Sequence, residues 1–155
     1  MKRIITQIKN IERIEKELNN NYAGVIALQL GEERFVQIPT PYLYKDKNVF
    51  LFFTHNDEIY DQIQFDSNVA FTIVRDIKVN KKRKNDPTAS YHFCATKISG
   101  IVRKVDDMKF VEELKKSYAD KYSAKTDKRN LDFKVIDKVV VIDTEEINSI
   151  EEIGG

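Results

Sequence analysis

Short apolar segments separated by polar turns recur along the chain, and this order constrains the fold more than any other feature. Residues 34–38 alternate polar and apolar side chains. The other apolar segments cover residues 23–30, 49–53, 68–76, 90–105 and 135–142. Such segments are typical of β-strands, and Gly31-Glu32-Glu33 is typical of a hairpin turn. The sequence therefore predicts about six antiparallel strands with short connections.

Other segments have the spacing of helices. Apolar residues recur near the N-terminus at steps of three and four: Ile4, Ile8, Ile11, Ile14 and Leu18. This spacing predicts a helix over residues 1–20. Similar patterns predict helices over residues 56–65, capped by Asn56, and 106–122, capped by Asp106 or Asp107. The acidic tail, residues 144–155, is expected to be partly loose.

Composition excludes several classes of protein. The 155 residues suit a single domain, residues 1–155. With 26 basic and 25 acidic residues the net charge is +1, so no nucleic-acid partner is expected. No apolar run approaches the ~20 residues that span a bilayer, so no membrane contact is expected either. One cysteine, Cys94, cannot form an internal disulfide, which fits a cytoplasmic protein.

Known motifs of nucleotide-binding folds and zinc hydrolases are absent from the sequence, which has no GxGxxG, P-loop, HExxH, GxSxG or CxxC. An antiparallel sheet of about six strands covers its edges or closes on itself. The residues alone therefore predict a mainly β fold, a small barrel with helices at its rim.

The order of these segments resembles the FMN-binding split-barrel proteins related to pyridoxamine 5'-phosphate oxidase. A strand ending in Pro leads to a polar turn and to a strand ending in an aromatic residue and Thr, here PTPYLYKDKNVFLFFT. A short helix and a strand follow, here IYDQIQFDSNVAF. The later step TKISGIVRKV, residues 96–105, also fits the family pattern. The resemblance covers residues 22–142 and implies a six-stranded antiparallel split β-barrel flanked by helices.

The resemblance also implies a homodimer that holds FMN at the subunit interface and oxidises or reduces a small-molecule substrate. Backbone at Gln37, Ile38, Pro39 and Thr40 would then lie along the flavin ring. Phe53, Thr54 and His55 would approach the ribityl phosphate. Lys81 and Lys82 would supply positive charge, and Ser90, Tyr91 and His92 would reach the site from the other subunit.

One departure from the family pattern leaves the cofactor open. The family places a basic residue in the first turn of the short helix, whereas this chain has Asp57 and Glu58 there. Two carboxylates near a phosphate repel it. Either the phosphate uses the basic loop at Lys81 to Lys84, or the ligand is not FMN.

Two alternatives therefore remain. The chain could be a haem-binding relative with His55 or His92 as ligand, or a non-catalytic binding module that has lost FMN. The sequence does not identify a catalytic residue, and its two histidines and one cysteine are too few to predict a metal site.

Overall fold

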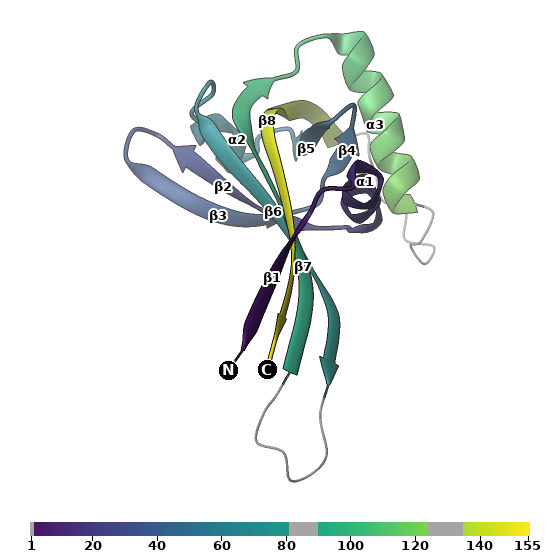
Figure 1. The fold of residues 1–155 in the computed structure, drawn as a ribbon. Coiled ribbons are helices and arrows are strands. Elements are labelled where there is room, and N and C mark those ends of the chain that lie inside the picture. Colours follow the sequence, from purple (N-terminus) through teal and green to yellow (C-terminus); the bar gives the residue numbers. More distant parts are fainter. Residues whose placement is uncertain (1, 81–89, 124–134) are drawn as a thin grey trace.

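A computed structural model describes residues 2–80, 90–123 and 135–155 of the chain, and Figure 1 shows their arrangement. The elements follow the chain in this order: β1 (Arg3–Ile8), α1 (Ile11–Asn20), β2 (Gly24–Leu30), β3 (Arg34–Thr40), β4 (Leu43–Lys45), β5 (Asn48–Thr54), α2 (Glu58–Gln62), β6 (Asn68–Asn80), β7 (Ser90–Lys104), α3 (Met108–Ser123) and β8 (Ile136–Gly154).

One antiparallel sheet connects all the strands of the described residues. Its order is β3-β2-β6-β7-β8-β5-β4, and β1 pairs with β8 outside this path. The expected mainly β fold with flanking helices is confirmed. The sheet has eight strands rather than six, because the chain also forms β1 and the three-residue strand β4.

The predicted helix over residues 1–20 is wrong in its first half. Residues Arg3–Ile8 form β1, which pairs with the end of β8 from Arg3 opposite Gly154 to Ile8 opposite Ser149. The helix begins only at Ile11, where the Asn10 side chain caps it by accepting from the Arg13 amide at 3.1 Å. The four-residue spacing of Ile4 and Ile8 is compatible with a helix and does not exclude a strand. The strand forms because its pairing partner lies at the far end of the chain.

The acidic tail is also not loose. β8 continues through it to Gly154, with β7 paired along one side and β1 paired on the other side from Ser149 to Gly154. A strand with a partner on each side satisfies its backbone polar groups, so the charged side chains do not prevent its order. The N- and C-termini therefore lie side by side (Figure 1).

Of the caps of the other two helices, one was predicted correctly and one was not. Asp107 caps α3 by accepting from the amides of Lys109 and Phe110, as predicted. At α2 the cap is Asp57, whose carboxylate accepts from the amide of Ile59 at 2.9 Å. Asn56 instead has a left-handed backbone conformation with φ of 65°, one that asparagine tolerates. The predicted Asn56 cap is therefore wrong by one residue.

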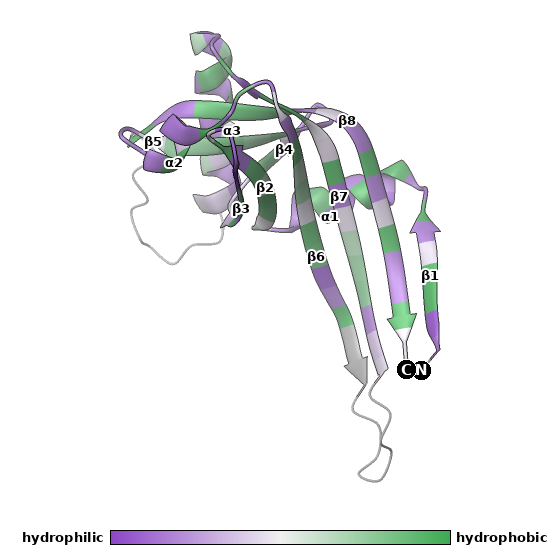
Figure 2. Cartoon of the chain, turned by 90° about the vertical axis from the view of Figure 1, so that its left-hand side faces the viewer, coloured by the Kyte–Doolittle hydropathy of each residue, from purple (hydrophilic) through white to green (hydrophobic). Residues whose placement is uncertain are grey.

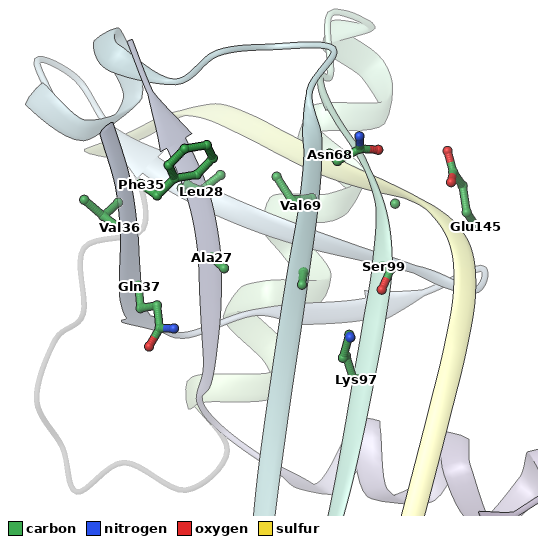
Figure 3. Close-up of a pocket in the computed structure, with 12 residues that line it drawn as sticks. Ala27, Leu28, Phe35, Val36, Gln37, Asn68, Val69, Lys97, Ser99 and Glu145 are labelled. Atoms are coloured by element: carbon green, nitrogen blue, oxygen red, sulfur yellow. The ribbon is translucent and has the colours of Figure 1, made fainter. Parts of the chain in front are cut away.

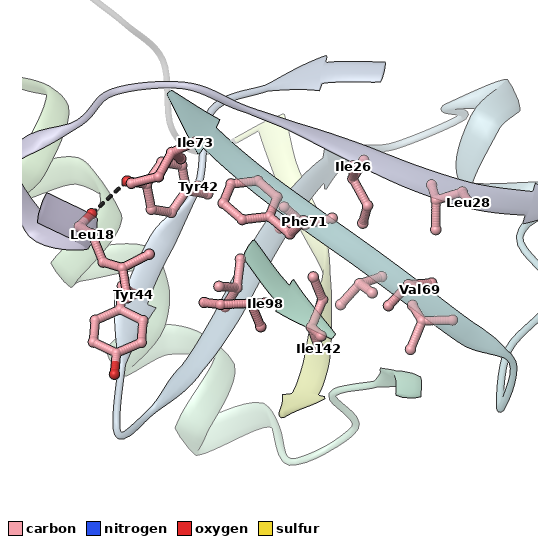
Figure 4. Close-up of a cluster of buried hydrophobic side chains, with 14 of the residues drawn as sticks. Leu18, Ile26, Leu28, Tyr42, Tyr44, Val69, Phe71, Ile73, Ile98 and Ile142 are labelled. Atoms are coloured by element: carbon pink, nitrogen blue, oxygen red, sulfur yellow. Dashed lines mark hydrogen bonds between the residues drawn. The ribbon is translucent and has the colours of Figure 1, made fainter. Parts of the chain in front are cut away.

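Two apolar cores hold the sheet in shape. The larger one lies inside the barrel, where Phe71 packs edge-on to Tyr42 with ring centroids 4.8 Å apart (Figure 4). The smaller one lies between α3 and the sheet and includes Leu114 and Phe50. Beyond the barrel, β1 and the ends of β6, β7 and β8 form an extended arm (Figures 1 and 2).

A half-buried lysine at the end of α3 makes stability depend on pH. Lys121 donates to the Tyr42 carbonyl at 2.9 Å and lies 3.8 Å from the centre of the Tyr42 ring. Burial nevertheless lowers the pKa of Lys121 to about 8. Between this pH and its usual range near 10.5, the unfolded chain binds the proton and the folded chain does not. The free energy of unfolding should therefore rise with pH across that window.

Burial shifts the pKa of two phenols in the opposite direction, raising the pKa of Tyr44 and of Tyr122 to about 12. Above pH 10 the unfolded chain releases these phenol protons while the folded chain keeps them, so the free energy of unfolding falls there. We therefore expect the rise only between pH 8 and 10. Urea denaturation at pH 7, 8, 9 and 9.5 tests this prediction. The Lys121→Met variant should lose the rise, while Lys116→Met, at an exposed position of α3, should keep it. Equal pH slopes for all three proteins would contradict the prediction.

Candidate functional site

The sheet has one face that points away from the barrel core, and the strand register shows which residues share it. Directly opposed residues of neighbouring strands point to the same side. One such row runs Pro39, Val25, Thr72, Lys97, Asn148 across β3, β2, β6, β7 and β8. The next row runs Gln37, Ala27, Ala70, Ser99, Glu146. We call this surface the hollowed face; it also includes Phe35, Val74, Ala95 and Ile150.

Three adjoining hollows lie along this face. The first has a volume of about 690 Å³ over β3, β2, β6 and β7 (Figure 3). The second, of about 630 Å³, shares Ala27, Gln37, Ala70 and Lys97 with it. The third, of about 340 Å³, lies over β6, β7 and β8. Lys97 lines all three, so its ammonium group stands at the junction of the hollows.

Small side chains form the floor of the first two hollows, and exposed apolar side chains surround it. Ala27 and Ala70 lie opposite each other on β2 and β6. Phe35 is 75% exposed, Val74 57% and Val25 39%. A flat floor next to an exposed aromatic ring can contact a planar, aromatic molecule on both its face and its edge.

Lys97 is the basic side chain of the hollows, while the acidic side chains Glu145 and Glu146 line the first and the third hollow. The Lys97 side chain is exposed and makes no hydrogen bond, ion pair or ring contact with any described residue. Two other basic side chains of the sheet are already paired, Arg75 with Glu17 and Arg3 with Glu152. An unpaired ammonium group among small and apolar side chains attracts an anionic ligand group.

The predicted residues on β3 divide between two faces of the sheet. Gln37 and Pro39 line the hollows. Ile38 points to the other side and packs against the barrel core. Thr40 shares that side with Ile38, and its hydroxyl donates to the Pro41 carbonyl at 3.0 Å.

The residues predicted to contact the phosphate, Phe53, Thr54 and His55, lie at the other end of the sheet. Phe53 packs against Tyr60 of α2, with ring centroids 5.6 Å apart. His55 Nδ1 lies 2.8 Å from a carboxylate oxygen of Asp137. At this end the Asp57 carboxylate already accepts hydrogen bonds from the amides of Ile59 and Tyr60 at the start of α2. The structure does not bring these residues to the hollowed face of the same chain.

The residues predicted to reach the site from the other subunit are Ser90, Tyr91 and His92. They lie at the start of β7, at the tip of the arm. The Tyr91 hydroxyl donates to Glu152 at 2.8 Å, and His92 Nε2 lies 2.5 Å from a Glu151 oxygen. Tyr91 pairs with Gly154 at one end of β8, whereas Thr54 pairs with Ile136 at the other end. Ser90 lies beside Tyr91. Lys81 and Lys82 lie outside the described residues.

Sequence reasoning missed Lys97 and the small residues of the floor. The available signal was weak: in β7, Ala95, Lys97 and Ser99 alternate with the buried residues Cys94, Thr96 and Ile98. This alternation marks an outward face, but it does not show which other strands lie beside it. Among the described residues no group of three or more His, Cys, Asp or Glu could hold a metal ion.

Comparison with known proteins identifies the fold. No protein-family model matches the chain, and no curated protein does either. A solved structure of a candidate 5-nitroimidazole antibiotic resistance protein from Bacteroides thetaiotaomicron is 15% identical, covers all of this chain and 93% of its own, and has a TM-score of 0.76. An FAD-binding protein from Mesorhizobium loti is 14% identical, covers 96% and 98%, and has a TM-score of 0.66.

A candidate pyridoxamine 5'-phosphate oxidase from Corynebacterium glutamicum is also similar. It is 13% identical, the match covers 97% of this chain and 95% of that one, and the TM-score is 0.59. The structural neighbours thus include pyridoxamine 5'-phosphate oxidase-like and flavin-binding split-barrel proteins, and this chain has their fold. None of its described helices is both long and apolar enough to cross a membrane.

Proposed function

We propose that the chain binds a flavin on its hollowed face and, as a homodimer in the cytoplasm, uses it to oxidise or reduce a small molecule. The observation that carries this proposal is the pair of adjoining hollows with an alanine floor, an exposed phenylalanine and a free lysine. Their volumes of about 690 and 630 Å³ lie in the range of small-molecule sites. Neighbours of the same fold that are described as FAD-binding support it.

The residues present fit a flavin in their chemistry. Ala27 and Ala70 leave room for a ring against the sheet, and Phe35 adds an aromatic surface beside it. Gln37, at the edge of both hollows, can donate and accept hydrogen bonds, as the mixed edge of a flavin ring requires. A bound flavin supplies hydride transfer, and this chain would supply its binding and orientation.

The chain would hold the phosphate of the flavin differently from the arrangement that the resemblance predicts. Asp57 and Glu58 place negative charge at α2, where the resemblance predicts a phosphate contact. On the hollowed face Lys97 offers the opposite charge. We therefore expect Lys97, and not the first turn of α2, to attract the anionic part of FMN.

A second copy of the chain would cover the hollowed face. The same face exposes apolar side chains of three strands, Val25, Phe35 and Val74, and the arm adds Ile5 at 50% exposure. Ile5 belongs to this face because it pairs with Glu152, which in turn pairs with Phe93. Apolar side chains gathered on one face are typical of a surface that is buried on association.

Absorbance spectra test the proposal. The purified protein is mixed with excess FMN or FAD and desalted, and its spectrum and melting temperature are measured. We expect a retained two-band flavin spectrum and a melting temperature that rises with flavin concentration, since the ligand binds the native state. A colourless protein with an unchanged melting temperature would contradict flavin binding. A Soret band in the isolated protein would favour the haem alternative at His55 or His92.

A further inference from the structure

The third hollow is the smallest of the three, and charged, neutral polar and apolar side chains line it together. It lies over β6, β7 and β8 and has a volume of about 340 Å³. Lys97 and Glu146 carry opposite charges there, and Ser99 and Asn148 provide neutral hydrogen-bonding groups. Ala95 and Ile150 form an apolar end. The hollow therefore presents three kinds of contact within one small volume.

The strand register sets the two charges apart. Lys97 lies opposite Asn148, and Ser99 lies opposite Glu146. Lys97 and Glu146 are thus diagonal neighbours on adjacent strands, with Cβ atoms about 7–8 Å apart. Both side chains are exposed, and no ion pair joins them. The two charges are therefore both free to contact a third molecule.

We propose that the third hollow binds a small zwitterion with an apolar tail, of the chemical class of an α-amino acid. Its carboxylate would pair with Lys97, and its ammonium group would pair with Glu146. The tail would lie on Ala95 and Ile150. A ligand with both charges satisfies both side chains at once, whereas an anion alone would leave Glu146 without a partner.

The position of this hollow links it to the other two without depending on them. It shares Lys97 and Ser99 with the first hollow. A zwitterion bound there would lie beside whatever occupies the first hollow, and its carboxylate would compete with the anionic part of FMN for Lys97. The binding itself requires only protein groups, so it can be measured in the absence of flavin.

Three probes with the same propyl tail separate the contributions of the two charges. Norvaline carries both charges, pentanoate lacks the ammonium group, and butylamine lacks the carboxylate. Each is titrated into flavin-free protein, and binding is followed by NMR chemical shifts. We expect saturable binding of norvaline and about fivefold weaker binding of each analogue, the effect of losing one partly exposed ion pair.

Two variants assign the charges to their partners. In Lys97→Gln, norvaline should bind no better than butylamine, and in Glu146→Gln no better than pentanoate. Lys16→Gln, at an exposed position of α1 that lines none of the hollows, should bind norvaline like the unmodified protein. No saturable norvaline binding, equal binding of all three probes, or norvaline binding unchanged in both hollow variants would each overturn the proposal. None of these outcomes depends on whether the protein binds flavin.

Discussion

The substitution Ala70→Trp is expected to abolish flavin retention while the protein remains folded. Ala70 lines both of the larger hollows and lies between Ala27 and Ser99 in its row. An indole at this position would fill the space where a flavin ring would lie. We expect flavin affinity to fall by about 100-fold or more, equivalent to about 2.7 kcal/mol.

The fold should tolerate this change because Ala70 faces outward. Its neighbours Val69 and Phe71 point into the core, whereas a side chain at position 70 extends toward solvent or a bound ligand. A flavin titration followed by absorbance measures the affinity, and circular dichroism of the flavin-free variant measures the fold. A folded variant that binds flavin as tightly as the unmodified chain would show that the flavin lies elsewhere.

Ala119→Trp is the matched control for this experiment. Ala119 lies on α3, is partly exposed, and lines none of the three hollows. The control adds the same indole to the same chain, so it separates loss of the site from a general effect of a large side chain. We expect it to retain flavin as the unmodified protein does.

Much of the fold was predictable because its signals are local. Alternation at residues 34–38 and short turns predicted the β2–β3 hairpin, and apolar segments predicted the strands β5 and β7. Asp107 was among the predicted caps of α3. The N-terminal strand was not predictable in this way. β1 forms by pairing with the end of β8. Because this partner lies about 150 residues later in the sequence, no local pattern indicates the pairing.

The candidate site was less predictable because it depends on register. Of the residues predicted on β3, Gln37 and Pro39 line the hollows, whereas Ile38 and Thr40 face the other way. Lys97 became recognisable only once β2 and β3 were known to lie across β6 from it. A shift of one residue in any of these strands would exchange the two faces, and the sequence does not determine that register by itself.

Phe71→Ala should reduce the free energy of unfolding by about 4 kcal/mol, as expected for removing a fully buried aromatic side chain. Phe71 is 0% exposed and packs against Tyr42. Its ring lies so close to the β2 backbone that a Cβ atom at Gly24 would be 2.2 Å from Phe71 Cζ. The absence of a side chain at Gly24 therefore makes room for this ring, and alanine at position 71 would leave a cavity behind β2 that the neighbouring backbone cannot fill.

Phe35→Ala is the control for this prediction, because it removes the same side-chain atoms from a position that is 75% exposed. We expect it to change the free energy of unfolding by less than about 1 kcal/mol. Urea denaturation of both variants measures the difference. A loss below about 2 kcal/mol for Phe71→Ala would mean that the barrel relaxes around the missing ring. The hollowed face, formed by the outward residues of the same strands, would then lack the rigid support that a binding surface needs.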